Sequence, residues 1–226
     1  MTQHDMSIAN QSFPATRGDL NDALQALAST SKGNARPSTV YAGQFWLDDN
    51  TPSATTWTLN FYDGTDDIPV GYVNTTTNVY TPAGFGGARV GTQFDKTSST
   101  TLGDVTDLSV TVEAGRKYKF SAALDITTGG GGGKVAIGGT ATATSVAYTG
   151  KYIDNSGGTV IIYGRATSLG TAVAGSALGT SVIMEVEGSI VVNAAGTLTL
   201  QFAQNTSNGA PSSVLVGSTF TIQPIS

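Results

Sequence analysis

Hydrophobic and polar residues alternate with a period of two along much of the chain after residue 102. Tyr118, Phe120, Ala122, Leu124 and Ile126 form the clearest set, and this spacing places all five side chains on one face of a strand. The pattern therefore predicts strands in this part of the chain. Two shorter sets continue it: Leu198, Leu200 and Phe202, and then Val214, Val216, Phe220 and Ile222.

Eight strand-like runs are expected between residues 102 and 226, with no helical period between them. Glycine-containing turns separate several of the runs, as at 113–116 and 193–196. Short strands in this arrangement favour an antiparallel sandwich, most simply a jelly roll. The runs are 108–113, 117–126, 134–137, 142–149, 159–166, 182–192, 197–204 and 214–224.

One segment near the start has a helical period instead. Leu20, Leu24 and Leu27 recur at i, i+4 and i+7, which places them on one stripe of a helix, and Pro14 suits its first turn. The pattern predicts a helix over about 14–30. Because an isolated helix of this length is marginal in water, the leucine stripe needs a partner. Two alternatives are possible for this partner. One is the β module that follows in the same chain, and the other is a surface outside the chain, either copies of the helix or a docking surface on a larger particle.

A small β module is expected to follow the helix, ending near residue 74. It contains both tryptophans of the chain, and three strands are about the minimum for independent stability. We therefore expect a three-stranded meander with an aromatic-rich core. Its strand candidates are 43–48, 56–62 and 68–73, separated by turns at 49–52 and 63–67.

Residues 75–101 show no sustained hydrophobic period. Threonine, serine and glycine clusters fill the segment, which is typical of an extended linker. Phe85 and Phe94 are isolated hydrophobic residues within it, available for contacts with neighbouring chains. The expected domains are therefore 1–74, the linker 75–101, and a jelly roll over 102–226.

Composition and charge narrow the function classes. Only 12% of the 226 residues are charged, cysteine is absent, and His4 is the single histidine. These counts exclude cysteine chemistry and disfavour a histidine-based triad or metal site. The net charge of −5 and the pI of about 4.6 indicate no nucleic-acid partner, because the basic residues are scattered singly. Without a long apolar run or a signal-peptide pattern, we expect a soluble protein that is not inserted in a membrane.

Two local patterns resemble a phosphate-binding loop and a catalytic carboxylate pair, but each has a simpler interpretation. Residues 129–134 read Gly-Gly-Gly-Gly-Gly-Lys, yet the Walker spacing and the helix after it are missing, so we expect a flexible hairpin tip. Glu185 and Glu187 share a strand face, which is conceivable for a glycosidase pair. Exposed glutamates explain this spacing more simply.

Acidic residues cluster in the turns of the small module. Carboxylates on loops can bind calcium, but no spacing here matches the twelve-residue calcium loop, and aspartates in turns commonly cap their own backbone. The expectation is therefore no metal site, no cofactor and no catalytic residue. The aspartates concerned are Asp48, Asp49, Asp63, Asp66 and Asp67.

Segments 1–11, 13–15, 19–28 and 37–48 combine the helix with a Phe-Trp strand at a fixed distance. This combination resembles the N-terminal module of tailed-bacteriophage fibre proteins, over about the first third of the chain. In that family the module attaches a fibre to the virion. The resemblance implies that the anchoring and trimer-forming residues are Phe13, Leu20, Leu24, Leu27, Phe45 and Trp46.

The end of the chain carries a second, looser resemblance. Residues 196–205 and 213–220 look like the last two strands of phage fibre heads of the tumour-necrosis-factor-like jelly-roll type. Those heads are trimers that meet along one sheet face and project a tip for host-surface binding, so the resemblance implies a homotrimer. The chain lacks the β-helical shaft of long tail fibres, which favours a stubby spike.

Together these patterns predict a non-enzymatic virion protein, made in the bacterial cytoplasm without a signal peptide. It would be a short homotrimeric fibre or spike on a phage head or tail, attached to other phage structural proteins by its N-terminal module. Its head would bind a host-surface polysaccharide. For such binding we expect Tyr148 and Tyr152, beside a turn at Gly150, to be exposed, whereas Tyr163 fits the core equally well. The alternatives are a capsid decoration protein without receptor binding and a free carbohydrate-binding module.

Overall fold

The computed structural model of the chain divides into two compact units, Met1–Ala83 (unit 1) and Gly84–Ser226 (unit 2), and each is described by itself. The fold is mainly β, with one α-helix and sixteen strands among the described residues. All pairings between these strands are antiparallel. The structure describes residues 4, 7–8, 10–153, 160–175 and 181–225.

Helix α1 (Phe13–Ala28) lies where the leucine period predicts it. The N–H of Thr16 donates to Ser12 O at 2.9 Å in its first turn. The N–H of Ser31 donates back to Ala26 O at 2.6 Å, which closes the last turn. No helix in the described part of the chain is long and apolar enough to span a bilayer.

Unit 1 contains an antiparallel meander of four strands in sequence order. The N–H of Leu47 donates to Thr30 O at 3.1 Å, so the segment after α1 runs along the edge of the first strand. The predicted turn at 49–52 lies inside that strand, which bulges between Asp48 and Pro52 because the Asp48 carboxylate holds two backbone N–H groups there. The strands are β1 (Phe45–Ser53), β2 (Thr56–Tyr62), β3 (Asp67–Asn74) and β4 (Val79–Pro82).

The prediction that residues 75–101 form an extended linker is wrong. β4 is the fourth strand of the unit 1 meander, whereas β5 (Gly86–Arg89) and β6 (Phe94–Lys96) pair with strands of unit 2. These strands have only three or four residues, too few to show a hydrophobic period, and backbone pairing holds them in place. The boundary between the units is at Ala83 and Gly84.

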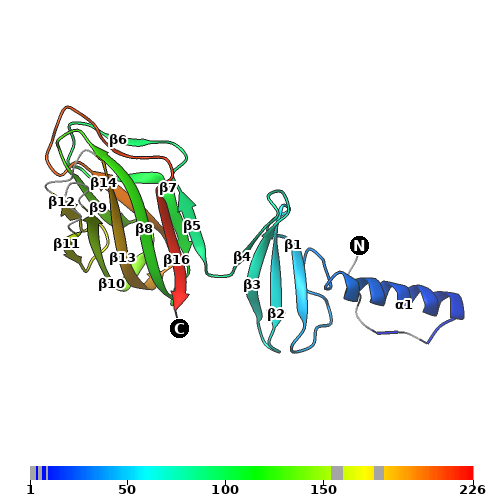
Figure 1. Cartoon of the computed structure of the whole chain (residues 1–226). Coiled ribbons are helices and arrows are strands. Elements are labelled where there is room, and N and C mark those ends of the chain that lie inside the picture. Colours follow the sequence, from blue (N-terminus) through cyan, green and yellow to red (C-terminus); the bar gives the residue numbers. More distant parts are fainter. Residues whose placement is uncertain (1–3, 5–6, 9, 154–159, 176–180, 226) are drawn as a thin grey trace. The chain divides into compact units, whose positions relative to one another are not determined.

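Unit 2 is a jelly-roll-like sandwich of two antiparallel sheets (Figure 1). The larger sheet has the order β11-β10-β13-β8-β15-β6, with β16 pairing both β8 and β5, and the smaller has the order β12-β9-β14-β7. Consecutive strands such as β7 and β8, or β13 and β14, lie in different sheets, so the chain crosses repeatedly between the layers. The bounds are β7 (Gly103–Val112), β8 (Lys117–Thr128), β9 (Gly133–Gly138), β10 (Thr142–Ile153), β11 (Val160–Ala166), β12 (Val173–Gly175), β13 (Ser181–Ala194), β14 (Gly196–Ala203), β15 (Ser212–Val214) and β16 (Thr219–Ile225).

The alternating sets form the core of the sandwich, as predicted. The set on β8 from Tyr118 to Ile126 is at most 3% exposed, and the set on β14 is fully buried. Val216 departs from the pattern and is 56% exposed. It lies in the turn between β15 and β16, where Gly217 has a φ of +100°, so its side chain leaves the sheet.

The glycine run at 129–133 is a packed crossing between the sheets and not the flexible hairpin tip predicted. It joins β8 to β9, which belong to different sheets. The N–H of Thr206 donates to Gly131 O at 2.8 Å, and a Cβ added to Gly131 would lie 2.6 Å from Thr206 O. Close approach of the two backbones therefore requires glycine here.

We expect Gly131→Ala to lower the free energy of unfolding by about 2 kcal/mol, because the added methyl group forces the crossing away from Thr206. Gly209→Ala is the matched control, since a Cβ at Gly209 meets nothing within 4 Å. Chemical denaturation of both variants measures the difference. Equal stabilities would mean that the glycine run is a loose tip after all.

Candidate functional site

The predicted leucine stripe of α1 is exposed in the chain. Phe13 is 79% exposed, Leu20 49%, Leu24 54% and Leu27 60%, whereas the buried residues of the helix are Ala23 and Ala26. The β module of unit 1 therefore does not cover the stripe, and the first of its two expected partners is wrong. Several large apolar side chains left in water along one helix face are typical of an interaction surface.

The exposed stripe continues into a groove of about 470 Å³ between the end of α1 and the start of β1. Leu27, Tyr41 and Phe45 line it, and the last two are 58% and 46% exposed. Tyr41 carried no signal in the sequence, because it stands alone in a loop. We call the residues Phe13, Leu20, Leu24, Leu27, Tyr41 and Phe45 the apolar surface of unit 1.

Trp46 does not belong to this surface, although the resemblance implies it. The side chain is 4% exposed, and its Nε1–H donates to Asp67 Oδ1 at 2.9 Å. Successive side chains of a strand point to opposite faces, so Trp46 enters the small core of unit 1 while Phe45 faces the groove. The Phe45 ring packs against Phe61 with 5.2 Å between the ring centroids.

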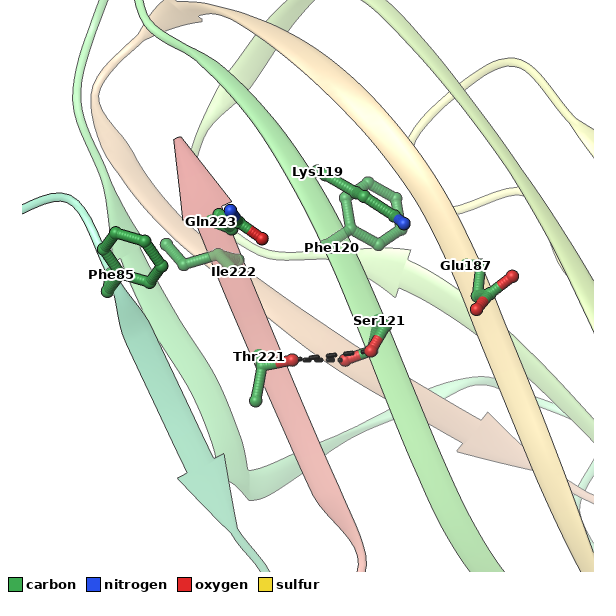
Figure 2. Close-up of a pocket in the computed structure, with 8 residues that line it drawn as sticks. All are labelled: Phe85, Lys119, Phe120, Ser121, Glu187, Thr221, Ile222 and Gln223. Atoms are coloured by element: carbon green, nitrogen blue, oxygen red, sulfur yellow. Dashed lines mark hydrogen bonds between the residues drawn. The ribbon is translucent and has the colours of Figure 1, made fainter. Parts of the chain in front are cut away.

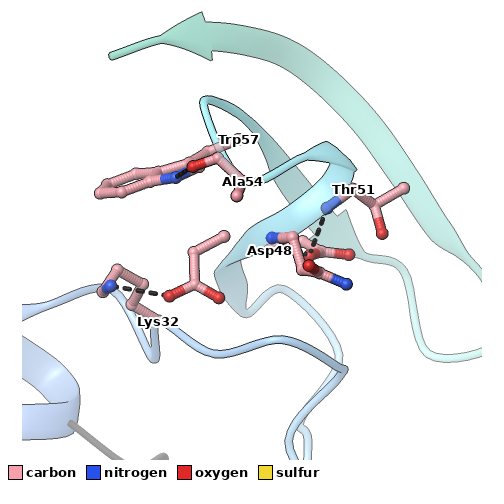
Figure 3. Close-up of polar contacts among 7 residues, drawn as sticks. Lys32, Asp48, Thr51, Ala54 and Trp57 are labelled. Carbon is pink, nitrogen blue, oxygen red and sulfur yellow. Dashed lines mark hydrogen bonds and ion pairs between the residues drawn. The ribbon is translucent and has the colours of Figure 1, made fainter. Parts of the chain in front are cut away.

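Two aspartates of unit 1 cap their own turns, as predicted. Asp48 Oδ1 accepts the N–H groups of Asn50 and Thr51 at 2.9 and 3.0 Å (Figure 3). Asp63 Oδ1 accepts those of Asp66 and Thr65, both at 2.7 Å, and these bonds lower the pKa of the Asp63 carboxyl. The carboxylates are thus occupied by backbone donors.

Asp49 serves a different contact, with Lys32. The Lys32 ammonium lies 2.7 Å from Asp49 Oδ2 and 4.7 Å from the centroid of the Trp57 ring (Figure 3), which is a cation–π arrangement. Among the described residues, no group of three or more His, Cys, Asp or Glu side chains could hold a metal ion.

The prediction that Tyr148 and Tyr152 are exposed is wrong, because they are 2% and 1% exposed. β10 runs through Gly150 without a turn, so both rings point into the sandwich. The Tyr148 hydroxyl donates to Thr171 O and accepts the N–H of Ile137 at 3.3 Å, and burial raises its pKa. These tyrosines stabilise the core and cannot form a sugar platform. The side chain of Tyr163 lies outside the described part of the chain.

We expect Tyr148→Phe to cost about 1–3 kcal/mol at neutral pH, because the N–H of Ile137 loses its partner. The raised pKa means that the folded protein keeps the Tyr148 proton where the unfolded chain, above about pH 10, has lost it. Stability from this hydroxyl is therefore lost as the pH rises through that range.

The difference in unfolding free energy between wild type and Tyr148→Phe should accordingly narrow above about pH 10. Denaturant titrations at neutral and alkaline pH measure it. Tyr80→Phe, at a 51% exposed side chain, is the control and should show a smaller loss at neutral pH. A difference in unfolding free energy that stays constant with pH would contradict the buried, hydrogen-bonded role of the Tyr148 hydroxyl.

Glu185 and Glu187 share one face of β13, as predicted, with Glu187 exposed and Glu185 half-buried. Lys151 of β10 reaches both, with Nζ 2.9 Å from Glu185 Oε2 and 3.7 Å from Glu187 Oε2. The hydrogen bond to Glu185 is the main cause of the raised pKa of Lys151. The three residues form an ion-paired cluster on the outer face of the larger sheet.

A groove of about 250 Å³ lies on the same outer face (Figure 2). Strand register places Thr221 of β16 opposite Ser121 of β8, and Ser121 opposite Glu187 of β13. Gln223 and Lys119 form the next row on this face. Polar side chains thus stand in two rows across neighbouring strands, and we call this site the sheet groove.

An aromatic ring and a hydroxyl pair complete the sheet groove. Phe85, which is 45% exposed, stands beside β5 at one edge (Figure 2). Thr221 Oγ1 donates to Ser121 O at 3.3 Å and lies 3.4 Å from Ser121 Oγ. Sequence reasoning missed the site because Ser121 and Thr221 are 100 positions apart, and only strand register brings them together. Its available signals were Phe85, noted as an isolated hydrophobic residue, and Glu187, noted for sharing a strand face with Glu185.

No protein-family model matches the chain, and no curated protein matches it either. Among solved structures, a chain in the structure of the Gx strain of infectious bursal disease virus is similar to this one. The two chains are 12% identical, and the match has a TM-score of 0.23 and covers 75% of this chain and 51% of that one. The T=1 particles derived from the same virus give 11% identity and a TM-score of 0.24 over 98% of this chain and 55% of that one. The chain spans about half the length of these proteins. TM-scores this low establish neither common ancestry nor common function.

Proposed function

We propose that this chain is a non-enzymatic structural protein of a bacteriophage virion: a short homotrimeric fibre or spike that mediates attachment to a host surface. Unit 1 joins the copies and anchors them to other phage structural proteins, and unit 2 is the displayed head. The observation that carries the proposal is the apolar surface of unit 1. The resemblance of residues 1–48 to phage fibre modules supports the same assignment.

The spacing on α1 suits association with copies of the same helix. Phe13, Leu20 and Leu27 follow one another at intervals of seven residues, the spacing of one of the two core positions in a coiled-coil heptad. Each of these side chains is about half exposed or more, and burying such a side chain contributes on the order of 1 kcal/mol. Several such contributions per copy favour an assembly over a free helix.

The groove at Tyr41 and Phe45 is the second part of the apolar surface. It lies at the end of α1 and the start of β1, where Leu27 is both the last residue of the seam and one edge of the groove. We assign the seam to the other copies and this groove to the virion partner. Mixed apolar and polar lining, with Gln44 beside Phe45, is typical of an interface between separately folded proteins.

The head would act by weak contacts repeated in several copies. Joining the heads through α1 raises the effective concentration of each at a surface, so avidity exceeds the affinity of one head. Low charge fits this assembly, because ionised side chains are costly at buried interfaces, and only 12% of the chain is charged.

Leu20→Glu tests the seam, since it places a carboxylate at the centre of the exposed stripe. We expect native mass spectrometry at micromolar concentration to give three copies for the wild type and a single copy for the variant. Gln25→Glu adds the same charge at another exposed position of α1 and should remain trimeric. A monomeric wild type, or a Leu20→Glu variant that still contains three copies, would refute the role of the stripe.

A further inference from the structure

We infer that the sheet groove of unit 2 binds a neutral saccharide, with Phe85, Thr221, Ser121, Gln223 and Lys119 as contact residues. The inference deepens the proposed function by naming the ligand class and the site on the head. The groove chemistry itself does not depend on how many copies assemble. Four features of the groove carry the argument, namely its shape, its hydrogen-bonding groups, its charge and its aromatic edge.

The shape of the groove suits a short stretch of a chain polymer. Its rows span β16, β8 and β13, and neighbouring strands lie about 4.8 Å apart while same-face residues are about 6.7 Å apart along a strand. The polar patch therefore measures about 10 Å by 7 Å. A groove of about 250 Å³ over such a patch accommodates a small part of a ligand and leaves the remainder in solvent.

The hydrogen-bonding groups match a ligand covered with hydroxyls. The Ser121 hydroxyl can donate and accept, and the Gln223 amide does the same through two atoms. The Thr221 hydroxyl, which donates to Ser121 O, is left to accept, and Lys119 only donates. A hydroxyl of a saccharide likewise donates one bond and accepts others. Such a mixture of donors and acceptors recognises polyhydroxylated ligands better than purely acidic or purely basic ones.

The charges near the groove disfavour strongly ionic ligands. Lys119 and Glu187 line it and cancel formally, and the adjacent Lys151 and Glu185 form their own ion pair at 2.9 Å. A phosphate or sulfate would meet Glu187, and an amine would meet Lys119, at an energetic cost in either case. A neutral ligand meets no such opposition.

Phe85 supplies the apolar contact that a saccharide requires. The ring is 45% exposed at the edge of the groove, and the face of an aromatic ring carries partial negative charge. The C–H groups on one face of a sugar ring are weakly positive and pack on such a surface. Phe85 therefore takes the role that the sequence pattern had assigned to Tyr148 and Tyr152.

Saturation-transfer NMR on the full chain tests the inference. The probes are neutral oligosaccharides of glucose, galactose, mannose and N-acetylglucosamine, with sulfated and sialylated counterparts. We expect transfer to at least one neutral probe, a dissociation constant raised at least tenfold in Phe85→Ala and in Thr221→Val, and no transfer to the charged counterparts. Ile183→Ala removes a 48% exposed side chain of β13, outside the groove, and should bind as the wild type does.

Three results would overturn the inference: no transfer to any neutral probe, charged probes that bind as well as neutral ones, or Phe85→Ala binding unchanged. A further possibility is that the groove is a contact between copies of the chain. Native mass spectrometry of Phe85→Ala tests it, because the variant would then contain fewer copies than the wild type. The Leu20→Glu variant distinguishes the two proposals. If the groove is a saccharide site, that variant binds a short oligosaccharide with the wild-type dissociation constant, whatever its number of copies.

Discussion

The inward-facing set on β8 is the constraint on which unit 2 depends. Tyr118, Phe120, Leu124 and Ile126 are almost completely buried, and β8 pairs with β13 on one side and with β15 and β16 on the other. A slip of one residue would turn these side chains into water, so burial fixes the register of the neighbouring strands. The same register aligns the outward residues into the rows of the sheet groove. The core and the candidate site are therefore two faces of one arrangement.

Unit 1, in contrast, leaves much of its apolar surface exposed. Its sheet buries Trp46 and the capped aspartate turns close its loops, yet α1 leaves its largest apolar side chains exposed. Within one chain this arrangement forgoes the favourable free energy of burying those side chains. The proposed association with copies of the same helix would recover it. The division between a self-sufficient sandwich and an incomplete helical surface is the physical basis for the proposed assembly and display.

Long periodic segments were predictable from sequence, and isolated residues were not. The alternation on β8 and β14 and the leucine period of α1 placed these elements correctly, because each rests on several residues that bury or expose together. The linker prediction for residues 75–101 failed because strands of three or four residues are too short to show a hydrophobic period. Backbone pairing holds them instead, β4 with the neighbouring β3, and β5 and β6 with strands far along the chain. The prediction that Tyr148 is exposed also failed. Gly150 indicated a turn, but β10 continues through it because of its pairing with the neighbouring strands. The sequence identified Phe85 as an isolated hydrophobic residue but could not assign it to the sheet groove, because only strand register brings the lining residues together.

The central claim is that unit 1 joins the copies while unit 2 folds and acts without that contact. Sedimentation equilibrium of the full chain and of residues 84–226 alone tests it most directly. The account predicts a trimer for the full chain and a folded monomer for residues 84–226. A trimer of equal stability formed by residues 84–226 alone would contradict it, because the copies would then meet through the sandwich and the exposed face of α1 would need another explanation.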